Sequence, residues 1–279
     1  MYKLPSLQQL LEAGVHFGHQ VRRGHPRMRP YIYGAREGVH IIDLTKSEQT
    51  LKEACDYVHE LGRLSKTLLF VGTKKQARPI VEEIAKRLGS PYLIQRWIGG
   101  FLTNFDEIQK NIKKYKETKS QKEKGELSKY TKKEQLLIDR RMVKLERDFS
   151  GTVELTSLPD AIFVVDAASD DIAVREANRV GIKVVAIADS NCDPTKIDYP
   201  IAGNDDAIKS IKVLVETVAS AYEEGKKEAG KVAAKLAKKE EKEIKKREED
   251  VVAGELAEEV AEAEEKVEKA SVEESERKV

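Results

Sequence analysis

The chain has 279 residues, 40% of them hydrophobic, so it can bury a sizeable core, but Cys55 and Cys192 are too few for a disulfide framework. Its N-terminus lacks the apolar run of a signal peptide and its longest uncharged apolar stretches are strand-sized, which predicts a protein that is neither secreted nor membrane-spanning. The formal net charge of +1 divides into −9 for residues 248–279 and +10 for residues 1–247, which predicts a polyanion as the partner of the basic part.

The predicted elements alternate between strands and helices. In chain order they are strands at 31–33 and 39–44, a helix at 47–64 with Ser47 as N-cap, a strand at 67–72, a helix at 75–88, a strand at 161–166, a helix at 171–180, a strand at 183–188 and a helix at 205–222. Near-continuous apolar strands that alternate with helices indicate a parallel sheet covered by helices on both faces.

The segment at 104–150 interrupts this alternation. Apolar residues recur there at heptad spacing in two runs, first at Phe105, Ile108, Ile112 and Tyr115, then at Ile138, Met142, Leu145 and Phe149. Two such seams predict an antiparallel coiled-coil hairpin that projects as a finger from the domain. Residues 108–150 carry 14 bases and 7 acids, so its exposed sides are predicted to be positive.

The chain is accordingly divided into four parts. Residues 1–103 form the first part of an α/β domain with a basic N-terminal segment, 104–150 the inserted hairpin, and 151–225 the second part of the α/β domain. Residues 226–279 form a charged tail, disordered or transiently helical, because its heptad seam at Leu256, Val260, Ala263, Val267 and Ala270 is too thin to bury much surface.

The segment VHFGHQVRRGHPRMRP at 15–30 contains three histidines, four arginines and no acid. One interpretation is a zinc site in which His16 and His19 are joined by His25 or His40. The other is a phosphate-binding surface made by Arg22, Arg23, Arg27 and Arg29. The arginines favour the second interpretation, because they repel a cation and guanidinium groups bind phosphate oxygens in pairs.

Two further segments carry candidate chemistry. The strand at 67–72 runs into Lys74 and Lys75 at a helix start, a phosphate-binding geometry that lacks the full motif of a P-loop or a dinucleotide fold. Asp166 and Asp189 follow later strands, with Asp193, Asp205 and Asp206 in nearby loops. These acids fit either an enzyme that binds a nucleotide or Mg²⁺, or turns and helix caps.

The segment QRWIGGFLTN at 95–104 precedes the predicted finger. Arg96 and Trp97 are candidates for contacting a phosphate or stacking on a base, whereas a tryptophan packed at the root of the finger is an equally good interpretation.

Several segments together resemble one known family. They are FGHQVRR at 17–23, PYIYG at 30–34, HIIDL at 40–44, FVGTKKQA at 70–77, QRWIGGFLTNF at 95–105, NCDP at 191–194 and NDDAI at 204–208. In this order, across roughly 2–222, they resemble the bacterial family of small ribosomal subunit protein number two.

The resemblance implies a flavodoxin-like α/β domain with an inserted coiled-coil hairpin. It also implies a structural role on small-subunit ribosomal RNA (rRNA) between head and body, a docking surface for the large mRNA-binding ribosomal protein number one, and no enzyme activity. Gly24-His25 and Ala167-Ala168-Ser169 depart from the family pattern at two loops.

The prediction is therefore a cytoplasmic, ribosome-bound, non-enzymatic scaffold without cofactor or metal. The residues expected to contact rRNA are Arg22, Arg23, Arg27, Arg29, Lys74, Lys75, Arg96, Trp97, Asn104, Lys110, Lys113, Lys114, Lys132 and Lys133. One alternative is an α/β enzyme that uses Lys74, Asp166 and Asp189. Another is an adaptor whose finger and acidic tail hold a second protein. Whether His16 and His19, or Asp189, Asp193 and Asp205, hold a structural ion stays open.

Overall fold

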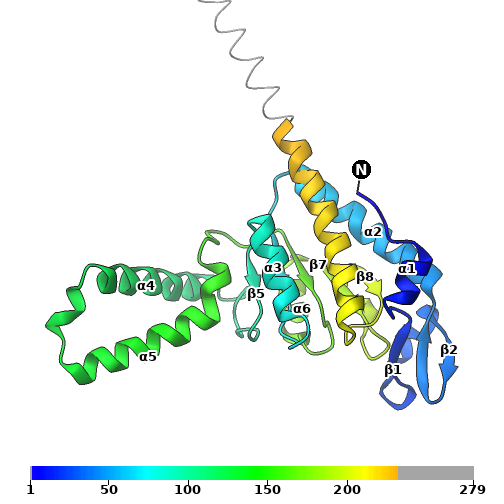
Figure 1. Cartoon of the computed structure of the whole chain (residues 1–279), viewed down its shortest axis with the longest axis horizontal. Coiled ribbons are helices and arrows are strands. Elements are labelled where there is room, and N and C mark those ends of the chain that lie inside the picture. The colour runs from blue at the N-terminus through cyan, green and yellow to red at the C-terminus, as the bar shows by residue number, and fades with distance from the viewer. Residues whose placement is uncertain (1, 232–279) are drawn as a thin grey trace, which may run out of the picture. The chain divides into compact units, whose positions relative to one another are not determined.

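A computed structural model describes residues 2–231 of the chain. Residues Met1–Lys227 form one compact unit, which contains the sheets and helices described below (Figure 1). The predicted tail lies outside the described residues from 232 onward. None of the described helices combines the length and the apolar content needed to cross a membrane.

Five parallel strands form the central sheet. They are β4 (Leu68–Val71), β5 (Tyr92–Leu93), β6 (Ala161–Val164), β7 (Lys183–Ala188) and β8 (Tyr199–Ala202). Their order across the sheet is β5-β4-β6-β7-β8, which is 2-1-3-4-5 when the five are counted along the chain. This is the strand order of flavodoxin-like, doubly wound sheets. The strands predicted at 67–72, 161–166 and 183–188 are confirmed by β4, β6 and β7.

The two edge strands have no equivalent among the predicted elements. β5 has only two residues, which is too short to produce a pattern. β8 contains Pro200, and a proline weakens a strand prediction although it is tolerated at a sheet edge, where no neighbouring strand needs its missing N–H.

Helices cover both faces of this sheet, as predicted. On one face, α2 (Leu44–Arg63), α3 (Arg78–Leu88) and a helix at 208–231 pack against Phe70 and Phe163. On the other face, α6 (Asp171–Val180) packs against Leu69 and Ile162. Successive strand residues point to opposite faces, so one apolar strand supplies both cores.

Helix starts differ from the predicted ones because other side chains cap them. The prediction of Ser47 as N-cap is wrong, because Asp43 accepts a hydrogen bond from the Thr45 N–H at 2.9 Å and α2 begins at Leu44. α3 begins at Arg78 after a turn, not at 75. The helix predicted at 205–222 begins at 208, after a turn capped by Asn204, and reaches 231, the last described residue.

The N-terminal part adds α1 (Leu7–Glu12) and an antiparallel sheet. Its strands β1 (Phe17–Gln20), β2 (Ile32–Arg36) and β3 (Val39–Ile42) have the order β1-β3-β2. β2 and β3 confirm the strands predicted at 31–33 and 39–44, whereas β1 was not predicted. Between β1 and β2 the chain forms two 3₁₀ helices, η1 (Val21–Arg23) and η2 (Pro26–Tyr31). Residues 17–42 are called the N-terminal module below.

The interruption at 104–150 contains two long helices, α4 (Phe105–Glu123) and α5 (Lys132–Phe149), joined through η3 (Glu126–Lys129) and followed by η4 (Ser150–Thr152). The Tyr115 hydroxyl donates to Glu146, and Lys122 pairs with Asp139 at 2.6 Å. From Tyr115 to Lys122 the chain advances by seven residues in α4, whereas their partners Glu146 and Asp139 are seven residues apart in the opposite direction in α5. The two helices therefore run antiparallel. Figure 1 shows them extending together from the side of the sheet.

The helix at 208–231 crosses α2 at two glycines. A Cβ atom at Gly225 would lie 2.1 Å from the carbonyl oxygen of His59, and one at Gly62 would lie 2.5 Å from that of Tyr222. Both distances are too short for carbon and oxygen, so the crossing requires glycine on both helices.

We expect Gly225→Ala to lower the free energy of unfolding by about 1–3 kcal/mol, because the two helices must separate to admit the methyl group. Gly230→Ala is the matched control, since an added Cβ at Gly230 meets nothing within 4 Å. The control should be neutral or stabilising by up to about 1 kcal/mol. Urea denaturation of both variants measures the difference, and equal stabilities would contradict the close crossing.

Candidate nucleic-acid interface

The N-terminal module presents its arginines on η1 and η2. Arg22, Arg23 and Arg29 are exposed, and within residues 2–231 no carboxylate pairs with any of the three. Arg27 is 60% exposed and lies 3.1 Å from a carboxylate oxygen of Asp193. Three of the four predicted arginines are therefore available to an outside anion, and the fourth is partly neutralised.

The histidines of this segment do not assemble the zinc site considered from the sequence. His25 accepts a hydrogen bond from the Arg27 N–H, and the His16 ring packs on Phe17 with centroids 4.0 Å apart. Burial lowers the pKa of His16, which favours the neutral ring. A metal site needs at least three His, Cys, Asp or Glu side chains whose ligand atoms lie close together. Within residues 2–231, the only such group with ligand atoms within 4.8 Å of one another consists of His19, Asp205 and Asp206.

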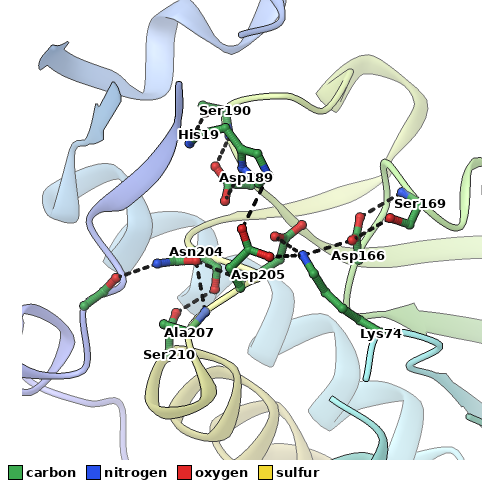
Figure 2. A network of polar contacts seen from close by, with 12 residues as sticks. His19, Lys74, Asp166, Ser169, Asp189, Ser190, Asn204, Asp205, Ala207 and Ser210 are labelled. Atoms are coloured by element: carbon green, nitrogen blue, oxygen red, sulfur yellow. Dashed lines mark hydrogen bonds and ion pairs between the residues drawn. The ribbon is translucent and has the colours of Figure 1, made fainter. Parts of the chain in front are cut away.

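His19 points inward, toward the carboxyl ends of the parallel strands (Figure 2). Its Nδ1 lies 3.0 Å from Asp189 and its Nε2 lies 3.5 Å from Asp206. The Asp189 carboxylate favours the charged ring more than burial disfavours it, so the pKa of His19 is raised. The His19 backbone N–H also donates to the Ser190 hydroxyl at 2.8 Å. The contacts with Asp189 and Ser190 join β1 to the loop that follows β7, and the contact with Asp206 joins it to the turn that follows β8.

Lys74 lies at the centre of the same group. Its Nζ is 3.1 Å from Asp166, 2.7 Å from Asp205 and 2.6 Å from Asp206 (Figure 2). Burial lowers the pKa of Lys74, but the carboxylates raise it more, so the ammonium group stays charged. The cation is thus directed into the protein, whereas the neighbouring Lys75 is exposed. We call Asp166, Asp170, Asp189, Asp205 and Asp206 with Lys74 and His19 the carboxylate cluster.

The carboxylates of this cluster differ in charge state. Burial raises the pKa of Asp205 to about 7 and that of Asp170 to about 6. Burial also acts on Asp166, but hydrogen bonds from Ser169 and the charge of Lys74 outweigh it and hold the pKa of Asp166 low. Asp170 accepts a hydrogen bond from the Thr73 hydroxyl at 2.9 Å. Asp166, Asp170 and Asp205 therefore each carry a burial cost, which their polar and charged neighbours offset to different degrees.

The position of the cluster decides against a phosphate ligand there. In doubly wound sheets, ligands bind outside the carboxyl ends of the strands where the strand order reverses, here between β4 and β6. The cluster fills that place with Lys74 from the β4 loop and Asp166 from the β6 loop. Its carboxylates outnumber its two basic groups, so a nucleotide phosphate would meet repulsion. The nucleotide-binding interpretation of Lys74, Asp166 and Asp189 is not favoured by this geometry.

Asn204 connects the cluster to the N-terminal segment. Its backbone N–H donates to the Val15 carbonyl at 3.1 Å, and its side-chain amide donates to the Gly14 carbonyl at 3.1 Å. The His25 N–H donates to the Ser190 carbonyl at 2.7 Å. Arg22 and Arg23 lie between Val15 and His25, so their backbone is held by hydrogen bonds on both sides.

A second buried carboxylate, Glu176 of α6, organises the root of the hairpin. One of its oxygens accepts hydrogen bonds from the Trp97 indole at 3.1 Å and the Gly100 N–H at 2.7 Å. The other accepts from the Leu102 N–H at 3.1 Å and from Thr103. Burial raises the pKa of Glu176, but these donors outweigh it and the pKa is lowered. No periodicity or motif in the sequence marks Glu176, because all its partners lie far from it along the chain.

The remaining predicted residues fall into two groups. Trp97 packs on Phe101 with ring centroids 5.3 Å apart and is only partly exposed. The exposed group comprises Arg96, Asn104, Lys110, Lys113, Lys114, Lys132 and Lys133. Among these, Lys110 pairs with Glu107 at 2.6 Å.

These features define a class of protein: an α/β protein with flavodoxin-like strand order, whose ligand crevice is filled by its own side chains and whose exposed segments are basic. Residues 10–225 match the model of the ribosomal protein S2 family. The chain belongs to that family, which consists of structural ribosomal proteins and not of enzymes.

Several curated relatives carry the name small ribosomal subunit protein uS2. The protein from Coprothermobacter proteolyticus is 49% identical over 79% of this chain and 82% of its own length. Those from Nitratiruptor sp. and Dictyoglomus thermophilum are 47% and 48% identical, each over 79% of this chain and over 83% and 89% of their own lengths. The predictions of a non-enzymatic small-subunit protein that acts in translation on the ribosome are thereby confirmed.

We expect Glu176→Gln to lower the free energy of unfolding by about 2–3 kcal/mol, because the amide replaces an acceptor oxygen with a donor amid N–H groups. The wild-type advantage should be present above the usual glutamate pKa and be lost as pH falls through the lowered folded-state pKa. Glu216→Gln, at an exposed ion pair, is the control and should change little. Thermal unfolding across pH measures both, and equal losses would contradict the role of Glu176.

Lys74→Met and Lys75→Met form a second matched pair. We expect Lys74→Met to cost about 3–5 kcal/mol near pH 8, because it leaves Asp166 and Asp205 buried without their cation. The loss should shrink as pH falls below about 7, where Asp205 takes up a proton. Lys75→Met should change stability by less than about 0.5 kcal/mol. Denaturant titration at both pH values tests this, and a similar loss in the two variants would refute the central role of Lys74.

Proposed function

We propose that this chain binds small-subunit rRNA through the N-terminal module, with Arg22, Arg23 and Arg29 as its principal phosphate contacts. The observation that carries the proposal is the fixed, acid-free presentation of these side chains on η1 and η2. Anchoring at His19 and His25 limits the conformational entropy lost on binding. Guanidinium groups on such a frame suit paired contacts with phosphate oxygens.

The exposed residues Lys75, Arg96, Asn104, Lys110, Lys113, Lys114, Lys132 and Lys133 extend this basic surface in our proposal. Arg27 supports it from its ion pair with Asp193. Lys74 acts indirectly, because its cation holds the carboxylate cluster on which the module rests. Trp97 contributes mainly by packing at the hairpin root, where Glu176 fixes its indole.

Binding of this kind is mostly electrostatic and shape-dependent. Folded RNA presents a deep, narrow major groove that side chains cannot read, so phosphate contacts dominate. Neutralised phosphates release counterions, and the affinity then falls steeply with salt.

The finer assignments rest on the family resemblance together with the two helices at 104–150. We propose that α4 and α5 form an inserted antiparallel coiled coil, supported by the buried seam of Ile108, Ile112, Met142 and Phe149. We further propose that the chain lies between head and body of the small subunit and helps to dock the mRNA-binding ribosomal protein number one.

We expect Arg22→Ala/Arg23→Ala to weaken binding to purified small-subunit rRNA and to reduce the slope of log affinity against log salt by about 1.4–1.8. Filter binding across a KCl series measures the slope. The control, Arg63→Ala/Arg87→Ala, also removes two positive charges but from the ends of α2 and α3, away from the module. Equal slopes for both double variants would rule out the assignment of Arg22 and Arg23.

A further inference from the structure

Large apolar side chains are exposed on α5 and not on α4. Leu136, Leu137 and Val143 are 51%, 55% and 66% exposed, whereas none of the exposed large hydrophobic residues of the described chain lies on α4. Single exposed apolar residues are ordinary, but a group on one helix marks an interaction surface. The contrast between two helices of similar length and charge requires an explanation particular to α5.

The positions of these residues define one face. Leu136, Arg140, Val143 and Arg147 are spaced four, three and four residues apart. The residues that face α4, namely Ile138, Met142, Leu145 and Phe149, have the same spacing but are shifted by two positions. Two residues correspond to about 200° around a helix, so the first set lies opposite the contact with α4. We call residues 136, 137, 140, 143, 144 and 147 the outer face of α5.

The outer face is positive as well as apolar. Arg140, Lys144 and Arg147 lie on it and are exposed, and of these only Arg147 has an ion-pair partner within residues 2–231, namely Asp148.

The other acids of α5 are engaged elsewhere. Glu134 caps the helix at Thr131, Asp139 pairs with Lys122 of α4, and Glu146 accepts from Tyr115 of α4. The acids of α5 are therefore not placed to neutralise Arg140 and Lys144 at the centre of the outer face.

We propose that the outer face of α5 docks an acidic amphipathic helix of a neighbouring protein in the small subunit. Leucine and valine at heptad spacing pack against apolar side chains of a partner helix, and the flanking lysines and arginines select one with acidic flanks. An RNA partner alone would not explain the exposed apolar residues, because phosphate groups form favourable contacts only with the basic side chains. The outer side of α4 carries Lys110, Lys113 and Lys114 without an exposed large apolar residue, as an RNA-facing surface would.

This inference rests on the proposed function, since the partner is sought in the assembled subunit. The experiment places the photocrosslinker p-benzoylphenylalanine at Leu136 or Val143 of the full-length chain and purifies small subunits that contain it. Lys113 on α4 is the matched control position. After irradiation, crosslinked protein and crosslinked rRNA are separated, and the crosslinked peptide is identified by mass spectrometry.

We expect positions 136 and 143 to crosslink to a segment of another protein that is acidic and has heptad-spaced apolar residues, and position 113 to crosslink to rRNA. Leu136→Glu/Val143→Glu should lower the yield of a protein crosslink from position 137 about tenfold while the chain still enters the subunit. Both substitutions are at exposed positions, and the unfolding midpoint of the purified variant checks that it is folded.

Crosslinks from 136 and 143 to rRNA alone, to a protein segment without acidic flanks, or to nothing would overturn the inference and leave the proposed function standing. If the chain binds rRNA and enters the subunit but gives one of these crosslinking results, the inference about α5 fails while the proposed function stands. Failure of the unsubstituted chain to enter small subunits would overturn the proposed function and this inference together.

Discussion

The ion pairs of Lys74 with Asp166, Asp205 and Asp206 are the interaction on which the arrangement of this protein depends. The charges of Lys74, Asp166 and Asp205 are buried and therefore costly, and the cation and the carboxylates stabilise one another. The lysine comes from the loop after β4, Asp166 from the loop after β6, and Asp205 from the turn before the helix at 208–231. One ammonium group therefore fixes three loops that are remote in sequence at one edge of the parallel sheet.

The N-terminal module is coupled to the same edge through His19. The ring lies between Asp189 and Asp206, so a side chain of β1 supplies a basic group to acidic loops that belong to the other sheet. The result is a separation of charge, with carboxylates directed inward at the crevice and arginines outward on η1 and η2. The crevice, which serves phosphate ligands in other proteins of this fold, is thereby closed to them, and exposed arginines lie instead on the surface of the module.

The sequence was sufficient for the features that depend on local pattern. The apolar strands β4, β6 and β7 and the heptad spacing of Ile108, Ile112 and Tyr115 can all be recognised in the amino-acid sequence. It was insufficient where the partner is distant. Lys74 has the spacing of a phosphate-binding lysine, and only the approach of Asp205, 131 residues later, directs its cation inward. Glu176 looks like one more polar residue of α6 until the fold places five backbone and side-chain donors around it.

The two buried acidic centres explain how exposed basic segments can be presented in a fixed geometry. The carboxylate cluster holds the module that carries Arg22 and Arg23, and Glu176 holds the loop from which α4 departs. Each centre removes backbone freedom that an outside partner would otherwise have to remove on binding. Because long basic side chains already lose rotamer entropy when they meet phosphates, a rigid backbone beneath them is what allows many weak contacts to add. The acids at the carboxyl ends of the strands, whose pattern resembles that of an active site, therefore act here on position, because they fix the backbone that carries the exposed basic residues.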